Sequence, residues 1–159
     1  MRVAYIQSIG GASGDMLLGA LLDLGLSLDT LRRELARLEV GGYQLTASQE
    51  ARREVRGTKL TVTVEDSTRY SPSALLKMVE KSTLPAAVKA QASAVLAALC
   101  RAQRRVHVQP PGPLELEELG SIDTLVDVVG VMIGLTELGV ARVYASPLVL
   151  GAAEPPRWP

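Results

Sequence analysis

The fold is decided by the stretch GGASGDMLLGALLDLG at residues 10–25, and the rest of the chain can be arranged around it. Residues 3–7, which precede it, are typical of a short buried strand. The glycines predict a tight turn. From there to Leu24 the apolar residues have helical spacing, and Gly25 stands where a glycine commonly ends a helix. This stretch therefore predicts a strand, a glycine-rich turn and an apolar helix in succession.

The remaining sequence predicts helices on both sides of a strand pair. Residues 28–38 have the pattern of an amphipathic helix, and the alternation of apolar residues with threonine over 60–64 predicts a strand. Residues 43–47 can pair with it antiparallel, so that the charged stretch 50–56 lies at the strand ends or on an exposed face. The other expected elements are helices at 73–81, 84–106 and 121–138 and a last strand at 142–145.

This order of elements predicts an α/β fold, with α+β left open, in which a small mixed sheet is packed by apolar helices. We expect a single domain over residues 1–151. The tail at 152–159 holds three prolines and one tryptophan, and we expect it to be disordered.

Composition excludes several classes of protein. The 159 residues include 17 Lys and Arg and 17 Asp and Glu, and this balance argues against a nucleic-acid partner, which would need a basic surface. A hydrophobic share of 47% argues against disorder. The single cysteine excludes an intramolecular disulfide framework and a cysteine-based zinc site. No apolar run is long enough to span a membrane, so we expect a soluble, cytoplasmic protein with no membrane partner.

The turn at residues 10–15 is a candidate ligand site. A glycine-rich turn between a strand and a helix directs backbone N–H groups at one point, where the helix dipole favours an anion. The sequence matches neither the phosphate loop that ends in Gly-Lys-Ser/Thr nor the dinucleotide pattern. The alternative is purely structural, with Ser13 as the helix cap and Asp15 as a first-turn acid. The candidate binding residues are Gly11, Ser13, Gly14 and Asp15.

The helix at 121–138 is the second candidate. It is apolar nearly all round, apart from one stripe made of Asp123, Asp127, Gly130, Gly134 and Glu137. Like charges four residues apart disfavour a helix, and each interior glycine costs about 1 kcal/mol against alanine. The glycines would allow another backbone to approach, and the aspartates would hold a cation or a polar ligand. In the alternative reading, Asp123 only complements the helix dipole and Asp127 is solvated.

The first helix carries a related stripe, made of Asp15, Gly19 and Asp23. We expect the two helices to pack through their glycines, with Gly19 on one side and at least one of Gly130 and Gly134 on the other. Asp15 would then lie near both aspartates of the second helix. Oxygen ligands of this kind suit Mg²⁺ or Mn²⁺, which commonly keep water molecules and a phosphate as further ligands.

Other reactive side chains carry weaker signals. His107 is the only histidine and is expected at a surface helix end, while Cys100 is expected in the core. One histidine cannot form the imidazole-rich site that nickel or zinc prefers, so we expect the isolated chain to bind nickel weakly. The basic clusters are expected to be solvated; they are Arg52, Arg53 and Arg56, and Arg101, Arg104 and Arg105.

Residues 11–25 closely resemble the opening of the LarC-type nickel-insertion proteins. The likeness returns at 120–130, where that family has a glycine and two aspartates four residues apart, and again at 143–148. Because the order and separations of the three motifs also match, the resemblance covers the chain up to about Gly151.

This resemblance implies insertion of nickel into a sulfur-bearing pyridinium mononucleotide, with CTP and a divalent cation required. It implies metal ligation by Asp123, Asp127 and Glu118, the last being the one match to a His-x-His-Glu segment of the family. The chain departs from the family at Gln7, where an acidic residue is usual, and at residues 67–70, where histidines are usual.

Two hypotheses follow, because proteins of this family continue far beyond the motif at 143–148. In the first, the chain is the N-terminal part of a nickel-insertion enzyme that binds a nucleotide-like small molecule, and a separate polypeptide supplies the C-terminal half. In the second, it is a non-catalytic binding or accessory module that has lost the metal-ligand histidines. Under either hypothesis we expect the isolated chain to be inactive, and homo-oligomerisation is left open.

Overall fold

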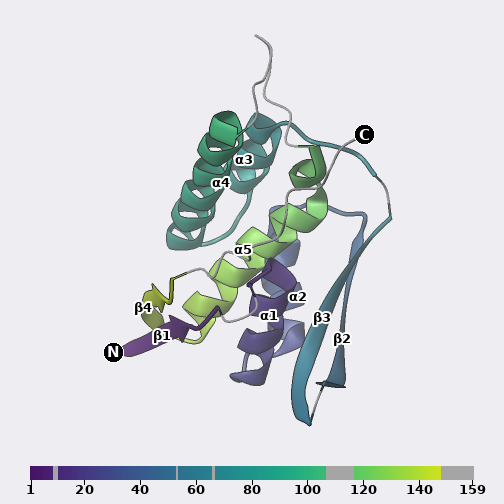
Figure 1. Cartoon of the computed structure of the whole chain (residues 1–159). Coiled ribbons are helices and arrows are strands. Elements are labelled where there is room, and N and C mark those ends of the chain that lie inside the picture. The colour runs from purple at the N-terminus through teal and green to yellow at the C-terminus, as the bar shows by residue number, and fades with distance from the viewer. Residues whose placement is uncertain (9–10, 53, 66, 107–116, 148–159) are drawn as a thin grey trace, which may run out of the picture.

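The computed structural model describes residues 1–8, 11–52, 54–65, 67–106 and 117–147 (Figure 1). The predicted order of strands and helices is confirmed, and with it the α/β class. The elements are β1 (Arg2–Ile6), α1 (Gly14–Asp23), α2 (Leu28–Leu35), η1 (Ala36–Leu38), β2 (Tyr43–Arg52), β3 (Val55–Val64), α3 (Pro72–Lys81), α4 (Ala86–Val106), η2 (Glu117–Gly120), α5 (Ile122–Glu137) and β4 (Val140–Ala145).

Serine caps fix where three of the helices begin. The hydroxyls of Ser27, Ser71 and Ser121 each accept a hydrogen bond from the backbone N–H three residues further on, at 3.0, 3.3 and 3.3 Å. At the other end, Gly25 follows α1 at φ 108° and Gly139 follows α5 at φ 66°. Because side chains strain that left-handed backbone, glycine is the residue that lets the chain leave each helix there.

Helix α5 is the centre of the core. It packs against α1, α2 and α4, while α1 also lies on β3 (Figure 1). The predicted burial of this helix is confirmed, because Leu125, Val126 and Val129 are fully shielded from solvent. The other large, fully buried side chains are Ile133 of α5 and residues of the helices and the hairpin around it: Leu18, Leu31, Leu35, Leu60, Leu75, Val79, Val88 and Leu96.

The two glycine-bearing helices pack together as expected, but through the glycines of only one of them. A Cβ on Gly130 would lie 3.1 Å from the Leu18 side chain, and one on Gly134 would lie 2.8 Å from that of Leu21. The expectation for Gly19 is wrong: a Cβ there would lie 2.2 Å from the carbonyl oxygen of Thr58, on β3. The two stripes of α1 and α5 therefore do not meet glycine to glycine, because α1 turns Gly19 toward the hairpin.

The strands among the described residues form two separate two-stranded sheets, and not the single mixed sheet that the sequence suggested. Strands β2 and β3 make an antiparallel hairpin in which Tyr43 is opposite Val64 and Ala47 is opposite Leu60, so the predicted pairing is confirmed. The charged stretch at 50–56 lies at the hairpin end, as expected. Strands β1 and β4 pair in parallel, from the two ends of the described chain.

Strand β1 is not buried, which corrects the expectation for residues 3–7. Val3 is 47% exposed and Tyr5 is 65% exposed, and most of β4 is exposed as well. The apolar run indicated burial, but none of the described elements covers these two side chains. Figure 1 shows strand β1 at the margin of the molecule, where the N-terminus projects away from the helices.

Several expectations fall on residues outside the described ranges, namely Gly10 of the turn, His107 and the tail at 152–159. The same holds for the side chain of Glu118. Within the described part of the chain, no helix has the length and apolar character needed to cross a membrane.

Candidate functional site

The candidate site lies where α1 and α5 begin. Along the two helices, Gly14 contacts Asp127, Leu18 contacts Gly130 and Leu21 contacts Gly134. These contacts advance in the same direction on both helices, so α1 and α5 run parallel and their N-terminal ends lie at the same end of the pair. Both helix dipoles therefore present their positive ends to this region.

Gly14 is required here by the approach of a carboxylate. A Cβ on this residue would lie 2.3 Å from Cγ and Oδ2 of Asp127 and 2.4 Å from its Cβ. No side chain fits at such distances, so glycine is what allows the Asp127 side chain to lie against the start of α1. The sequence indicated Gly14 as part of an anion-binding turn. It did not predict that the residue accommodates an aspartate from α5.

Asp127 is an unusual carboxyl group. Its Oδ1 atom is buried and has no hydrogen-bond partner in the described part of the molecule. Burial, together with the smaller effects of the charges of Asp123 and Asp15, raises the pKa of Asp127 to about 7. Buried polar atoms are almost always hydrogen-bonded, so this oxygen points to a missing ligand or proton. The alternative that Asp127 is merely solvated does not hold.

Asp123 and Asp15 complete an acidic cluster with Asp127. Burial and the neighbouring charge of Asp15 raise the pKa of Asp123. The three aspartates are therefore close enough to interact electrostatically, and the charge of Asp15 disfavours ionisation of both Asp123 and Asp127. No three of the described His, Cys, Asp and Glu side chains lie together in a way that would hold a metal ion by themselves.

Ser13 does not act as a simple cap. It occupies the N-cap position of α1 with an extended backbone, but its hydroxyl makes no cap hydrogen bond and donates instead to the carboxylate of Asp15. The alternative interpretation, in which Ser13 caps the helix, is therefore correct about the N-cap position of Ser13. It is wrong about the hydrogen bond that the Ser13 hydroxyl makes. Gly11 adopts φ 94° in an exposed position, and no neighbouring group comes within 4 Å of a Cβ built on it.

The other acidic residues of the two stripes lie elsewhere. Asp23 accepts hydrogen bonds from the backbone N–H of Thr58 at 3.0 Å and from its hydroxyl at 2.5 Å, and these bonds lower the pKa of Asp23. Together with Gly19, it attaches α1 to the hairpin. Glu137 is exposed at the opposite end of α5. Of the acidic residues in the two stripes, only Asp15, Asp123 and Asp127 belong to the site.

Two serines at the carboxyl ends of β1 and β4 were missed by sequence reasoning. The N–H of Ser8 donates to Oγ of Ser146 at 3.0 Å, and the N–H of Ser146 donates to the carbonyl of Ile6 at 2.9 Å. The Ser8 hydroxyl is buried and, among the described residues, has no partner. Ligands of open α/β sheets commonly bind at the carboxyl ends of parallel strands, and the pairing of β1 with β4 was the signal needed to find these residues.

Cys100, the soft ligand that the sequence singled out within the described residues, lies on neither α1 nor α5. Cys100 is half-buried on α4 against the core, as expected, and burial raises the pKa of its thiol. Arg101, Arg104 and Arg105 are exposed, as predicted for a solvated cluster. Oxygen donors alone therefore mark the described site.

Taken together, the fold and the site define an α/β domain with an oxygen-donor site at two paired helix N-termini. The family model described as nickel insertion protein matches residues 4–154. The chain belongs to the nickel insertion protein family, which confirms the resemblance carried by the three motifs.

Individual relatives agree with this assignment. A protein of Syntrophobacter fumaroxidans named for nickel insertion is 42% identical over 151 residues, which are 95% of this chain and 39% of that protein. The pyridinium-3,5-bisthiocarboxylic acid mononucleotide nickel insertion protein of Desulfitobacterium hafniense is 35% identical over 152 residues, which are 95% of this chain and 38% of that protein. This chain thus spans about two-fifths of the length of these relatives. No solved structure matches it.

Proposed function

We propose that this chain is the part of a nickel insertion protein that holds a divalent cation and a phosphate group at the paired N-termini of α1 and α5. The complete protein would place nickel into a pyridinium bis-thiocarboxylic acid mononucleotide, as the name of the Desulfitobacterium relative states for that protein. The observation that carries the proposal is the buried, unpartnered Oδ1 of Asp127 beside Gly14.

The donor set fits a hard cation such as Mg²⁺ or Mn²⁺. Asp127 and Asp123 would supply carboxylate oxygens, and Asp15 would add its charge nearby. Such ions are commonly held by one or two carboxylates and retain several water molecules, so the lack of a three-residue cluster among the described side chains is compatible with binding. A bound cation would supply positive charge to a phosphate oxygen, and would offset the repulsion among the three carboxylates.

The start of α1 suits the phosphate. Because the Ser13 hydroxyl is turned to Asp15, it leaves the first-turn N–H groups of α1 without a side-chain cap. N–H groups at a helix N-terminus bind phosphate readily. The mononucleotide carries such a group, and so does CTP, so both are candidate ligands; Gly11, Ser13, Gly14 and Asp15 are the residues beside them.

Nickel itself is the cargo in this proposal. A bisthiocarboxylic acid brings its own soft sulfur donors, which suit nickel better than the oxygen donors of the described site. The role of the protein would then be to position the nucleotide.

A cytoplasmic location is part of the same proposal. The comparisons do not favour the alternative of a non-catalytic accessory module.

Calorimetric titration of the purified chain tests this function. Mn²⁺ and Mg²⁺ are titrated alone, and then nicotinic acid mononucleotide and CTP are titrated with and without the cation. We expect one cation to bind and to strengthen binding of at least one nucleotide. Asp127→Asn should abolish the cation heat, while Asp29→Asn, which alters an exposed aspartate on α2, should leave it unchanged. Equal heats for the parent and Asp127→Asn would refute the proposed site.

A further inference from the structure

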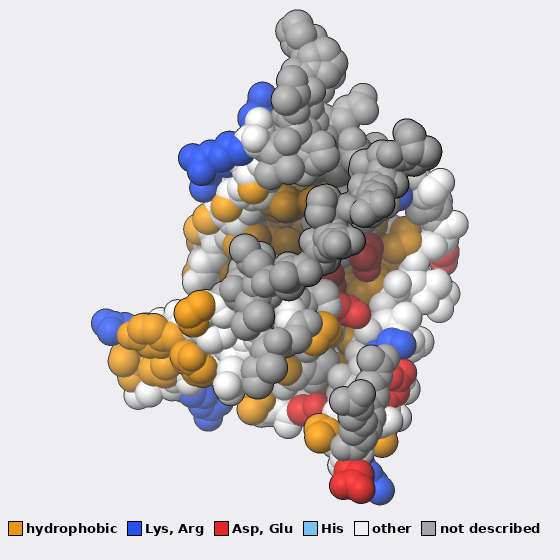
Figure 2. All heavy atoms as spheres, in the orientation of Figure 1, with side chains coloured by type: hydrophobic (Ala, Val, Ile, Leu, Met, Phe, Trp, Pro, Cys, Tyr) orange, Lys and Arg blue, Asp and Glu red, His pale blue; other side chains and the backbone are white. Residues whose placement is uncertain are grey.

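The sheet of β1 and β4 carries a concentration of exposed apolar side chains. In the described part of the chain, half of the large hydrophobic residues that are clearly exposed belong to this sheet or to the residue before it. They are Met1 at 89%, Val3 at 47%, Tyr5 at 65%, Val143 at 44% and Tyr144 at 51%. Figure 2 shows an orange area over β1 and β4. Contiguous exposed apolar surface of this kind is typical of an interaction site.

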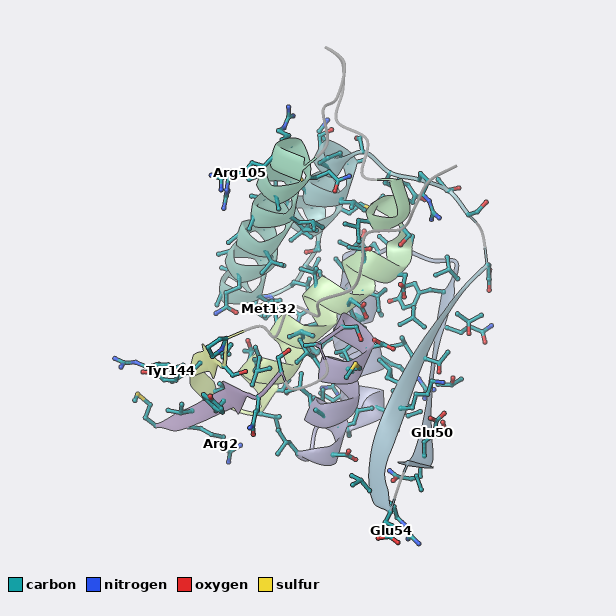
Figure 3. All side chains as sticks on the ribbon, in the orientation of Figure 1. Arg2, Glu50, Glu54, Arg105, Met132 and Tyr144 are labelled. Atoms are coloured by element: carbon teal, nitrogen blue, oxygen red, sulfur yellow. The ribbon has the colours of Figure 1, made fainter. Side chains whose placement is uncertain are left out.

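The strand register gathers the aromatic residues on one face. Tyr5 is directly opposite Tyr144, and Val3 is opposite Arg142. Because alternate residues of a strand share a face, Val3, Tyr5 and Tyr144 lie together on the same side. Figure 3 shows Tyr144 at this margin of the molecule, near the labelled Arg2.

A parallel sheet of only two strands is an incomplete structure. Parallel sheets occur almost only where both faces are covered, and a two-stranded sheet is at best marginally stable in water. The outer edges of β1 and β4 are unpaired among the described strands. Neither strand contains proline or lysine, and the one charged residue in each is an arginine, Arg2 in β1 and Arg142 in β4. The geometry therefore calls for further strands or a covering layer.

The relatives show where additional chain would join. Their matches run continuously over about 95% of this chain, so the remaining three-fifths of their length lies before or after the matched region. The family match covers residues 4–154, which include most of β1 and all of β4, the first and last elements of the described chain. The sheet of these two strands is therefore the part of the described domain that is nearest in sequence to either end of the match.

We propose that the face formed by Val3, Tyr5 and Tyr144, with the edges of β1 and β4, binds the remaining part of the nickel insertion protein. That part extends the parallel sheet and covers the two tyrosines, either as a separate polypeptide or as a continuation of the chain. The inference rests on the membership in a larger nickel insertion protein stated under the proposed function. It does not depend on the cation site.

Hydrogen exchange of the chain with a defined partner tests this surface. The probe is the part of the Syntrophobacter fumaroxidans relative that lies outside the match, added as a separate polypeptide and, in a second sample, fused after residue 159. We expect exchange at residues 2–6 and 140–145 to slow by at least about tenfold in one of the two samples, because those amides become paired or covered. Unchanged exchange in both samples overturns the proposal.

Matched variants locate the effect. The pair Tyr5→Ser and Tyr144→Ser should weaken binding of the separate polypeptide by at least about tenfold, while Leu24→Ser and Val55→Ser, at residues 71% and 73% exposed, should not. Circular dichroism checks that the variants fold, and the exchange result for the parent stands without them. If light scattering instead shows a dimer of the chain alone that the tyrosine variants disrupt, a second copy is the occupant and the proposal is wrong. Cation binding should be the same in both variants, so failure of the cation site remains distinguishable.

Discussion

The contact between α1 and α5 was predicted from the matching Asp and Gly stripes of two apolar helices, and strand β1 was expected to be buried because of its apolar run. The helix contact and the sheet of β1 and β4 differ in completeness. At the helix contact Leu18 and Leu21 are buried, and the glycines of α5 admit these side chains where a Cβ would crowd them. At the sheet the apolar side chains face solvent. We call the region around α5 finished, because its apolar side chains are covered within this domain. We call the sheet of β1 and β4 unfinished, because its apolar side chains are exposed.

Gly19→Ala should be among the most damaging single changes to the finished region. Its Cβ would lie 2.2 Å from the Thr58 carbonyl oxygen, and because that atom is backbone, either α1 or the hairpin must move. We expect a loss of about 3 kcal/mol and a melting temperature about 10 °C lower. Gly41→Ala, where the space around the new Cβ is open, is the matched control and should shift the melting temperature little. Equal melting temperatures for the two variants would contradict the packing described here.

Gly14→Ala should cost somewhat less stability but remove the proposed function. The new Cβ would overlap Asp127 from its Cβ to its Oδ2, so the carboxylate must leave its place. We expect a loss of about 2 kcal/mol and no rise in melting temperature on adding Mg²⁺ or Mn²⁺. Differential scanning fluorimetry with and without each cation measures both effects. A variant that retains the cation response of the parent would show that the Gly14 contact is irrelevant to binding.

The cation-free protein should lose stability as pH rises from about 4 to about 7. The pKa of Asp127 is about 7 in the folded chain and near 3.8 when unfolded, so the folded state retains a proton that the unfolded state has already released in this window. With the full effect halved for a group that is only half-buried, the loss is about 2 kcal/mol.

Denaturant unfolding at a series of pH values checks this dependence. Asp127→Asn cannot ionise at this position, so it should flatten the profile and be more stable than the parent at pH 8. A parent protein that gains stability from pH 4 to 7 would contradict the direction of the raised pKa.

The unfinished region should tolerate change most easily. In the isolated chain, Tyr5→Ser and Tyr144→Ser should each alter the free energy of unfolding by less than about 0.5 kcal/mol, because the side chains are largely exposed. Leu125→Ala, within the fully buried core, should cost about 3 kcal/mol in the same denaturation assay. If the tyrosine variants were as destabilised as Leu125→Ala, the sheet would already be packed within this domain.

The sequence predicted the helices and strands themselves far better than it predicted which of them pack against one another. Periodicity places Leu60 and Val62 on one strand face and identifies the hairpin partner, because both signals are local. Periodicity does not show which neighbouring element a helix face packs against. Gly19 of α1 was therefore expected to contact α5, but it contacts β3. Apolar composition likewise indicated burial of β1. Burial also requires a covering element, which the described domain does not supply.

The site was predictable in its members and not in its chemistry. Asp15, Asp123 and Asp127 follow from helical spacing once α1 and α5 pack side by side. Glycine is needed at position 14 because Asp127 lies against it, and Oδ1 of Asp127 is buried without a partner among the described residues. Both facts depend on the relative placement of two helices that are more than 100 residues apart in the sequence. The pairing of Ser8 with Ser146 depends in the same way on the parallel register of β1 and β4.

The most direct test of the cation site is a carbon-13 NMR titration of the Asp127 carboxyl group, with and without saturating Mg²⁺. Without the cation, we predict a midpoint near pH 7, in keeping with a pKa raised to about 7. With Mg²⁺ bound, the carboxylate is stabilised by the positive charge, and the midpoint should fall below about 5. The same midpoint in both samples, or an Asp127 that titrates near 3.8 without the cation, would contradict the account.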